Sequence, residues 1–352
     1  MINRDLAREV KSLMPSRERD TDRNSPVSMW NEMDRLRGTP EETTVVILRT
    51  RGCSWYDFSS CSMCGYFNDV NTNISVDNLK VQIDRAYDFM ERTRILKIFT
   101  SGSFLDQREV PEEAFNYFMK KMSDKVEKLL VESRTEYVTD KIMKKVKSYG
   151  VDTRIAIGVE SSNDYVIKNM VNKGTTFSKF INAAKILKNN KMELRSYLLL
   201  KPPYMSEEGG VQDAIQSVKD CAPYSDDISV NPMNIQKNTL VEKLWKKGEY
   251  RPPWLWSVVR VLLETQNVKS DVISYPTGGD RERGAHNDDR NQEVVKLIFN
   301  ASLNQDFRDL EDYYNRADKR KYMAHLKNEE CLPIQYDLDS FIRKISAGSV
   351  KI

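Results

Sequence analysis

The stretch Arg49-Thr50-Arg51-Gly52-Cys53-Ser54-Trp55-Tyr56-Asp57-Phe58-Ser59-Ser60-Cys61-Ser62-Met63-Cys64-Gly65-Tyr66 places three of the chain's five cysteines in one short segment. It follows an apolar, β-branched run, residues 43–48, which predicts a buried strand. Three thiols just beyond the carboxyl end of a strand suit zinc or an iron–sulfur cluster. A closed structural zinc site normally takes four protein ligands, and no other cysteine or histidine lies nearby in the sequence. The segment therefore predicts a metal or cluster site with one coordination position open.

Length and composition predict a globular protein. With 352 residues, 39% hydrophobic and 30% charged, the chain can bury a sizeable core, as one large domain or one domain with appendages. It contains no uninterrupted apolar run of about 18 residues, as a membrane span requires, and it begins without the apolar segment of a signal peptide. We expect a cytoplasmic location without membrane contact. Because the cysteine number is odd and three crowd one loop, we expect reduced thiols rather than disulfides.

The formal net charge of +3 is too small to identify a nucleic-acid partner. Basic residues cluster near both ends of the chain, but acidic residues are interleaved with them. We expect solvated helix faces there, with phosphate contacts as the alternative. The clusters are Arg4, Arg8, Lys11, Arg17, Arg19 and Arg23 near the N-terminus, and Arg316, Lys319, Arg320, Lys321 and Lys327 near the C-terminus.

From Thr43 onward, short apolar runs alternate with helical periodicity, which is typical of repeated βα units and a parallel sheet. Helix starts are indicated by Ser75, by Pro111, and by Thr139 or Asp140. The sequence predicts an α/β fold, a partial (β/α)6 barrel over residues 41–238. An N-terminal arm, residues 1–40, carries a helix from Arg4 to Leu13, and a mostly helical extension, residues 239–352, covers the barrel and the substrate site. The predicted strands are residues 43–48, 95–100, 128–131, 153–159, 194–200 and 228–230, with a strand-like run at 272–275 in the extension.

Parallel α/β barrels carry their chemistry at the carboxyl ends of their strands. Small, polar or charged residues follow most of the predicted strands, so we expect them to converge on one face with the three cysteines. They are Thr100, Ser101, Gly102, Ser103, Glu132, Glu160, Tyr197 and Asn231.

The three cysteines have two interpretations at this point. They could be structural zinc ligands completed by a distant Cys221, Cys331 or His286. Alternatively, three thiolates could hold a four-iron cluster and leave one iron free to bind a small molecule. Cys221 and Cys331 have no motif around them, which favours a role as small apolar filling residues.

The cysteines after the first strand, and Thr100-Ser101-Gly102-Ser103 after the second, resemble the radical S-adenosylmethionine (radical SAM) enzymes. That family usually has three residues and then two between its cysteines, whereas here seven separate Cys53 from Cys61 and two separate Cys61 from Cys64. The sequence around the cysteines, residues 49–55 and 61–66, resembles that of the radical SAM subunits of archaeosine synthases. The similarity extends over roughly residues 40–290. The supporting segments are residues 99–104, 132–134, 158–161, 231–234 and 283–287.

The resemblance implies a [4Fe–4S] cluster at Cys53, Cys61 and Cys64, with S-adenosylmethionine chelating the free iron. An external electron donor then allows a 5′-deoxyadenosyl radical to form, which removes a hydrogen atom from a lysine attached to 7-deazaguanosine in tRNA. Cleavage of the lysine carbon–nitrogen bond leaves archaeosine. The implied partner is a transglycosylase-like subunit that attaches the lysine.

The same resemblance supports cofactor contacts at the strand ends. Backbone groups of residues 100–103 should meet the amino group of the cofactor, because small side chains permit close approach. Glu132 and Glu160 are candidates for its ammonium group and ribose hydroxyls, with rim salt bridges as the alternative. Lys173 is a candidate for its carboxylate.

Candidate substrate contacts come from two later loops. Asn234, Gln236 and Thr239 follow the sixth strand and could bind the amino and carboxylate groups of lysine. His286 and Asn287 lie in the segment Gly284-Ala285-His286-Asn287, where the alternative for His286 is a structural hydrogen bond within the loop. Trp254 and Trp256 could stack bases, although tryptophans beside Pro-Pro more often pack in a core.

Two rival functions follow from the same residues. One is a radical SAM enzyme that methylthiolates or otherwise modifies another RNA. The other is a zinc-bearing RNA-binding scaffold without catalysis.

Overall fold

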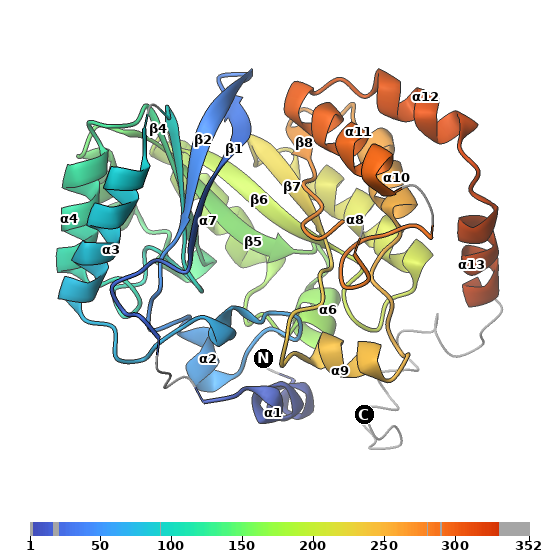
Figure 1. The fold of residues 1–352 in the computed structure, drawn as a ribbon, viewed down its shortest axis with the longest axis horizontal. Coiled ribbons are helices and arrows are strands. Elements are labelled where there is room, and N and C mark those ends of the chain that lie inside the picture. The colour runs from blue at the N-terminus through green and yellow to red at the C-terminus, as the bar shows by residue number, and fades with distance from the viewer. Residues whose placement is uncertain (1–2, 17–20, 92, 280, 289–290, 331–352) are drawn as a thin grey trace.

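Eight strands form one sheet whose spatial order, β1 to β8, follows the chain (Figure 1). The computed structural model describes residues 3–16, 21–91, 93–279, 281–288 and 291–330. Strands β2 to β8 run parallel, and β1 pairs with β2 in the antiparallel direction. The strands are β1 (Ser28–Leu36), β2 (Thr39–Ile47), β3 (Ile95–Phe99), β4 (Lys128–Ser133), β5 (Asp152–Glu160), β6 (Glu193–Leu200), β7 (Asp227–Pro232) and β8 (Asp271–Ile273).

The predicted fold class, an α/β partial barrel, is confirmed, because β2 to β7 are six successive parallel strands joined by helices. The sheet curls until its two edges approach each other at one end. There Arg35 of β1 donates to Asp271 of β8 at 3.0 Å. The barrel is therefore open along its length and tied at one rim by an ion pair.

Strand β1 was not expected from the sequence, which assigned residues 1–40 to an arm. Helix α1 (Arg4–Leu13) is present as predicted, but residues 28–36 join the sheet through a hairpin in which Leu36 pairs with Thr39. The turn residues Arg37 and Gly38 have φ of 51° and 85°, the backbone that a two-residue hairpin requires. The strand is half-exposed and rich in polar residues, so it lacks the apolar run that signals a strand.

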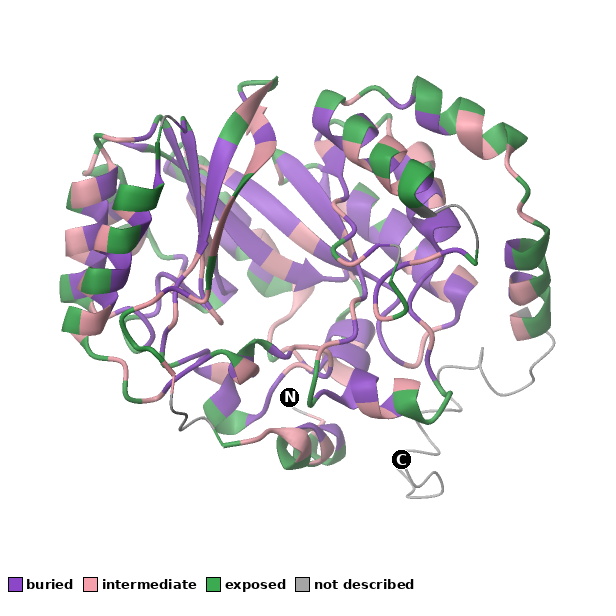
Figure 2. Cartoon of the chain, in the orientation of Figure 1, coloured by how far each residue is buried: buried purple, intermediate pink, exposed green. Residues whose placement is uncertain are grey.

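Helices on the outside of the sheet join the parallel strands. Ser75 and Thr139 cap their helices as predicted, accepting hydrogen bonds from the backbone N–H groups of Asn78 at 3.1 Å and Ile142 at 3.3 Å. Strands β4 to β7 are buried along most of their length (Figure 2). These helices are α3 (Val76–Phe89), α4 (Glu112–Met122), α5 (Asp140–Lys147), α7 (Phe177–Asn189) and α8 (Glu207–Cys221).

Charged side chains fill the barrel interior toward the amino ends of the strands. Arg195 of β6 donates to both oxygens of Asp34 in β1 at 3.1 Å, and also to Asp227 of β7. Lys97 of β3 lies 2.5 Å from Asp34. Burial opposes ionisation of Asp34, but Arg195 and Lys97 outweigh it and hold the pKa of this carboxyl well below its usual range. This network joins the first strand to the middle of the sheet.

The segment after β7 is mostly helical, as predicted, and the strand-like run predicted at residues 272–275 overlaps β8, which joins the sheet. Trp254 and Trp256 are buried in the main core, at 5% and 6% exposed, so the packing interpretation of these rings is confirmed. The boundaries at 40/41 and 238/239 cut through one sheet, because β1 and β8 belong to it. The helices are α9 (Leu240–Lys246), α10 (Leu255–Thr265), α11 (Asn291–Asn304), α12 (Arg308–Arg316) and α13 (Arg320–Glu330).

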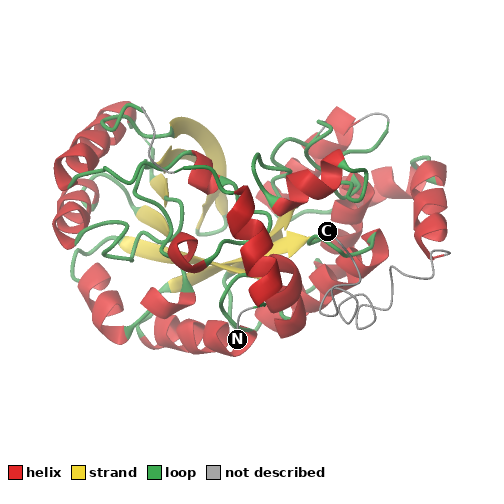
Figure 3. Ribbon diagram, turned by 90° about the horizontal axis from the view of Figure 1, so that it is seen from below, coloured by secondary structure: helices red, strands yellow, loops and turns green. Residues whose placement is uncertain are grey.

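The carboxyl ends of the parallel strands form a mouth bordered by α1, α2 (Trp55–Phe58), α6 (Asp164–Val166) and α9, all at the bottom of Figure 1. Seen from below, α1 lies in front of the strands (Figure 3). Its buried residues Leu6 and Val10 pack with Met170 and Leu240. Within the described residues, no helix is both long and apolar enough to cross a bilayer.

Candidate active site

The cysteine loop lies at this mouth, directly after β2. Helix α2 occupies the gap between Cys53 and Cys61, and the short helix η1 (Tyr66–Asn68) follows Cys64. Cys53 is buried and the other two thiols are half-buried. Burial raises the pKa values of the three thiols, to about 12 for Cys53 and Cys61 and about 11 for Cys64. These thiols therefore need a cationic partner in order to act as thiolates.

The cysteine loop is anchored to the segment that follows β5. The hydroxyl of Ser62 donates to the Met170 carbonyl at 2.6 Å. Asn172 has a left-handed backbone, with φ of 58°, and its amide donates to the Ser59 hydroxyl and the Ser60 carbonyl, both at 2.7 Å. These bonds position the loop on either side of Cys61.

The small-residue loop after β3 packs against the first cysteine. A Cβ atom on Gly102 would lie 2.7 Å from both Cα and Sγ of Cys53, so a larger residue would displace the cysteine. The hydroxyl of Tyr56 donates to the Ser101 carbonyl at 3.2 Å and lies 3.4 Å from Sγ of Cys64. The predicted convergence of the two loops is therefore present.

A buried carboxyl that sequence reasoning missed holds the loop after β3. Glu109, 2% exposed, accepts hydrogen bonds from Ser101 N at 2.9 Å, Ser103 N at 2.6 Å and Thr50 Oγ1 at 2.8 Å. Burial raises the pKa of Glu109 to about 7, against the opposing effect of these three donors. One carboxyl thus ties the end of β2 to the loop after β3.

Two further carboxyls and one ammonium lie beside these loops. Glu160 ends β5 with φ of 70°, and Lys173 donates to its carboxylate. Burial lowers the pKa of Lys173, but the nearby Glu160 carboxylate and, after it, Cys61 outweigh this effect and raise that pKa. Burial raises the pKa of Glu132 to about 8, although Lys173 opposes this rise. The site therefore places Glu132 and Glu160 beside the ammonium of Lys173, with Glu109 near Glu132.

The structure brings the predicted cofactor contacts, residues 100–103, Glu132, Glu160 and Lys173, to one place beside the cysteines. The Glu160–Lys173 pair is a salt bridge of the kind that the sequence left as the alternative. Contact of these residues with a cofactor remains a prediction.

Arg134 is a second residue that the sequence analysis did not assign. Its side chain is 9% exposed, donates to Glu136 at 2.6 Å and lies 5.4 Å from the ring centre of Trp55. The guanidinium opposes the effect of burial on the pKa values of Cys53 and Cys61, which places positive charge beside two of the thiols. Its position in the segment Glu132-Ser133-Arg134 was the available signal, whereas Glu109 stands in no motif.

Among the predicted substrate contacts, Gln236 lies nearest the cysteine loop. Its side-chain oxygen accepts the backbone N–H of Gly65, next to Cys64. Asn234 donates to the Thr277 carbonyl at 3.3 Å. Both side chains are half-buried in the loop after β7.

Thr239, His286 and Asn287 have structural roles in the loops that hold them. The Thr239 hydroxyl caps α9, accepting from Glu242 N at 3.1 Å and donating to the Gln236 carbonyl at 2.7 Å. His286 Nδ1 lies 2.8 Å from the Gly284 carbonyl oxygen. The side-chain oxygen of Asn287 accepts a hydrogen bond from Trp256 N at 3.4 Å. These bonds agree with the structural alternative for His286, and substrate contact by the three residues remains a prediction.

Neither of the two described candidates for a fourth ligand, Cys221 and His286, is placed as a ligand. Cys221 is buried in the main hydrophobic core at the end of α8, before β7 begins and so at the opposite end of the sheet from the cysteine loop. His286 uses its Nδ1 within its own loop, and Cys331 lies outside the described residues. Among the residues described, no three His, Cys, Asp or Glu side chains are grouped to hold a single metal ion.

Comparisons with known proteins agree with this geometry. A family model described as the Radical SAM superfamily matches residues 47–208. A cysteine loop after the first parallel strand of an open α/β barrel, with a small-residue loop packed on it, is the site of a radical SAM enzyme.

Two relatives are named archaeosine synthase subunit beta. The Methanosarcina acetivorans protein is 38% identical over 297 residues, 82% of this chain and 86% of that protein. The Thermococcus kodakarensis protein is 36% identical over 299 residues, 81% of this chain and 92% of that protein. The chain belongs to the radical SAM superfamily and, within it, to the family of archaeosine synthase beta subunits. It is also similar to a solved structure of an archaeal Methanocaldococcus infernus Elp3, with a TM-score of 0.48 and 16% identity over 74% of this chain and 63% of that one.

Radical SAM enzymes bind a [4Fe–4S] cluster and S-adenosylmethionine. The residues present fit this pair. The three thiols of one loop would hold such a cluster through three of its irons, which would leave one iron for the small molecule. The backbone of Gly102, which touches Cys53, and the charged groups of Glu132, Glu160 and Lys173 suit the polar ends of an amino acid cofactor.

Proposed function

We propose that this protein is a radical SAM carbon–nitrogen lyase of tRNA modification. Its substrate would be tRNA carrying a lysine-modified 7-deazaguanosine, and its product archaeosine. The observation that carries the proposal is the identity of 38% to an archaeosine synthase subunit beta over 82% of this chain. The gathering of three thiols and a charged cluster at the mouth supports the same conclusion.

The cluster and S-adenosylmethionine, when bound, supply the 5′-deoxyadenosyl radical that removes a hydrogen atom from the lysine side chain. In this proposal the residues of the chain bind and orient. Lys173 binds the carboxylate of the cofactor, and Glu132 and Glu160 accept hydrogen bonds from the ammonium and hydroxyl groups of the cofactor. Glu109 fixes the position of residues 101–103 through its hydrogen bonds with Ser101 and Ser103. Asn234 and Gln236, both in the loop after β7, are the proposed contacts for the amino and carboxylate groups of the lysine, and Gln236 also contacts the cysteine loop at Gly65.

The names of the two relatives imply a second subunit in their enzyme. We infer a corresponding partner here, a transglycosylase-like subunit that attaches lysine to the 7-deazaguanine in tRNA. An external electron donor completes the reaction, because cleavage of the cofactor consumes one electron.

Anaerobic reconstitution tests the proposal. The expected result is about four irons per chain, formation of 5′-deoxyadenosine, and archaeosine in nucleoside digests of lysine-modified tRNA incubated with cofactor and reductant. A variant with Cys61 replaced by Ala is the negative control, and a C221A variant is the matched control, since Cys221 lies in the core. Cofactor cleavage by the wild-type protein without archaeosine would instead favour modification of another RNA.

A further inference from the structure

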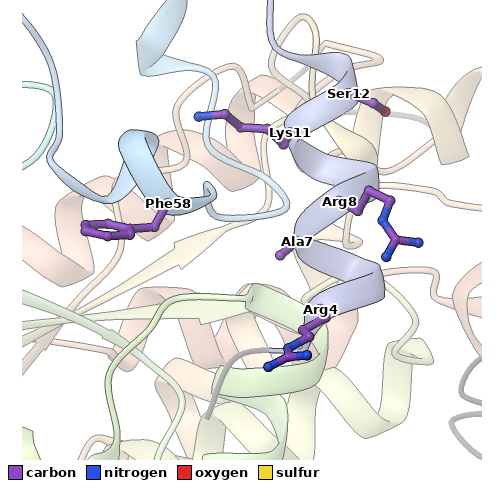
Figure 4. A pocket seen from close by; sticks show the side chains of 6 residues that line it. All are labelled: Arg4, Ala7, Arg8, Lys11, Ser12 and Phe58. Carbon is purple, nitrogen blue, oxygen red and sulfur yellow. The ribbon is translucent and has the colours of Figure 1, made fainter.

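A hollow on the outer side of the barrel mouth lies between α1 and the cysteine loop. Among the described residues that line it there are three cations and one aromatic ring, and no acid. They are Arg4, Ala7, Arg8, Lys11, Ser12 and Phe58 (Figure 4). Positive charge with an exposed aromatic ring is the combination that binds single-stranded nucleic acid.

Phe58 is the most exposed large hydrophobic side chain among the described residues, at 68%. It ends α2, which is built entirely from the residues between Cys53 and Cys61. The long gap between these two cysteines therefore presents a phenyl ring to solvent three positions before a predicted cluster ligand. An exposed ring at this position can stack on a base.

Helix α1 is held in a fixed position beside that ring. Its inner face packs on the barrel through Leu6 and Val10, and Lys11 donates to the Tyr56 carbonyl in α2. Arg4, Arg8 and Lys11 are all exposed. In Figure 4, Arg4 and Lys11 extend on the side of α1 that faces Phe58, and Arg8 extends on the other side.

Three acidic residues lie near the hollow in the sequence without lining it. Asp5 lies 3.7 Å from Arg8 at the exposed surface, and Glu9 pairs with Lys243 of α9. Asp57 precedes Phe58 and is exposed. The surface that faces the hollow itself stays cationic, which matches a phosphate backbone rather than an apolar protein surface.

We propose that α1 and α2 form the surface on which the RNA strand next to the modified nucleoside lies. Arg4 and Arg8 contact backbone phosphates, and Phe58 stacks on a neighbouring base. This inference rests on the proposed function, because a nucleoside that enters the mouth must bring its flanking phosphates across the rim. It assigns a role to part of the N-terminal basic cluster and to the long cysteine spacing.

The test measures binding of fluorescently labelled tRNA transcript to the full chain over a range of salt concentrations. The double variant R4A/R8A should bind about tenfold more weakly, and its salt slope should fall by about 1.4 to 1.8, because each phosphate contact contributes about 0.7 to 0.9. The F58A variant should bind about fivefold to tenfold more weakly with an unchanged slope, since stacking involves no counterion release.

Matched controls lie away from the mouth. K185A/K188A removes two exposed cations from α7, and F89A removes an exposed ring, 37% accessible, from α3. Both should bind tRNA as the wild-type protein does. Circular dichroism of every variant checks that the fold is intact.

Equal tRNA affinity of R4A/R8A, F58A and the wild-type protein would overturn the proposal, as would no measurable tRNA binding by the wild-type protein. If these variants instead lost co-elution with the lysine-attaching subunit while binding tRNA normally, the surface would belong to a protein partner. Product analysis separates the two hypotheses: weakened binding in the variants, with no archaeosine made by the wild-type enzyme, would support the surface and contradict the proposed reaction.

Discussion

Replacing Glu109 tests the positioning of the two loops that meet at the site. In E109A the backbone N–H groups of Ser101 and Ser103 lose their acceptor, whereas the hydroxyl of Thr50 can turn toward another. A buried donor left unsatisfied costs about 1 to 3 kcal/mol. The two N–H groups together predict a loss of about 2 to 6 kcal/mol in the free energy of unfolding.

E109Q is the graded variant. A glutamine can keep the bonds from Ser101 and Thr50 with its oxygen, but its amide nitrogen then faces Ser103 N–H, donor against donor. One lost acceptor predicts a loss of about 1 to 3 kcal/mol. The order of stability should be wild type, E109Q and E109A. S-adenosylmethionine affinity should fall in the same order, because both variants loosen the loop that carries Ser101 to Ser103.

Urea denaturation of the apo chain gives the free energies, and calorimetry on the reconstituted protein gives the cofactor affinity. E113A is the matched control, because Glu113 is exposed and its ion pair is with Lys80 at the surface, so its loss should cost less than about 0.5 kcal/mol. The reasoning is refuted if E109A and E113A have equal stability and equal cofactor affinity.

Three other outcomes are expected. C61A should lose both the cluster absorbance and 5′-deoxyadenosine formation, whereas C221A should keep both; cofactor cleavage by C61A would contradict the cluster assignment. K173M should keep its iron content but bind S-adenosylmethionine about tenfold more weakly or worse, since a charged hydrogen bond contributes about 1.5 to 3 kcal/mol; unchanged affinity in titrations would exclude the proposed contact. D34N should lower the free energy of unfolding by about 3 to 5 kcal/mol, because it removes the buried charge that Arg195 and Lys97 share and leaves Asp227 as the partner of Arg195. The pKa of Asp34 is lowered on folding, so the contribution of Asp34 to the free energy of unfolding is present above its ordinary pKa of 3.8 and is lost as pH falls. Urea denaturation at several pH values should therefore show a smaller loss of stability in acid for D34N than for the wild-type protein. Equal pH dependence of the two proteins would argue against this role.

Much of the barrel could be predicted from local sequence. The strands β2 to β7 can be recognised as apolar runs in the sequence, because parallel strands are buried on both faces of the sheet. Ser75 and Thr139 mark helix starts because capping depends on residues three positions apart. The cysteine loop was predictable for a similar reason, since its ligands lie within one short segment.

The edges of the sheet were harder to predict. Strand β1 carries polar residues because it is a half-exposed edge strand, and its inward Asp34 is stabilised by Lys97 of β3 and by Arg195, 161 positions later. A pattern read over neighbouring residues contains no trace of such a partner. The cap that Thr239 provides for α9 is different, because its partner Glu242 lies only three positions later and the pattern is local; substrate contact by Thr239 remains a prediction.

The sequence by itself determined the chemistry class: three thiols after a buried strand, with a small-residue loop after the next strand, because both features are local. Only the tertiary structure decided what surrounds them. It placed Glu109 under the loop of Ser101 to Ser103, and it laid α1 beside Phe58. The physical reason is that the burial and pKa of a side chain, and the charge of a surface, depend on which distant segments come into contact. Those contacts are set by the curvature of the whole sheet.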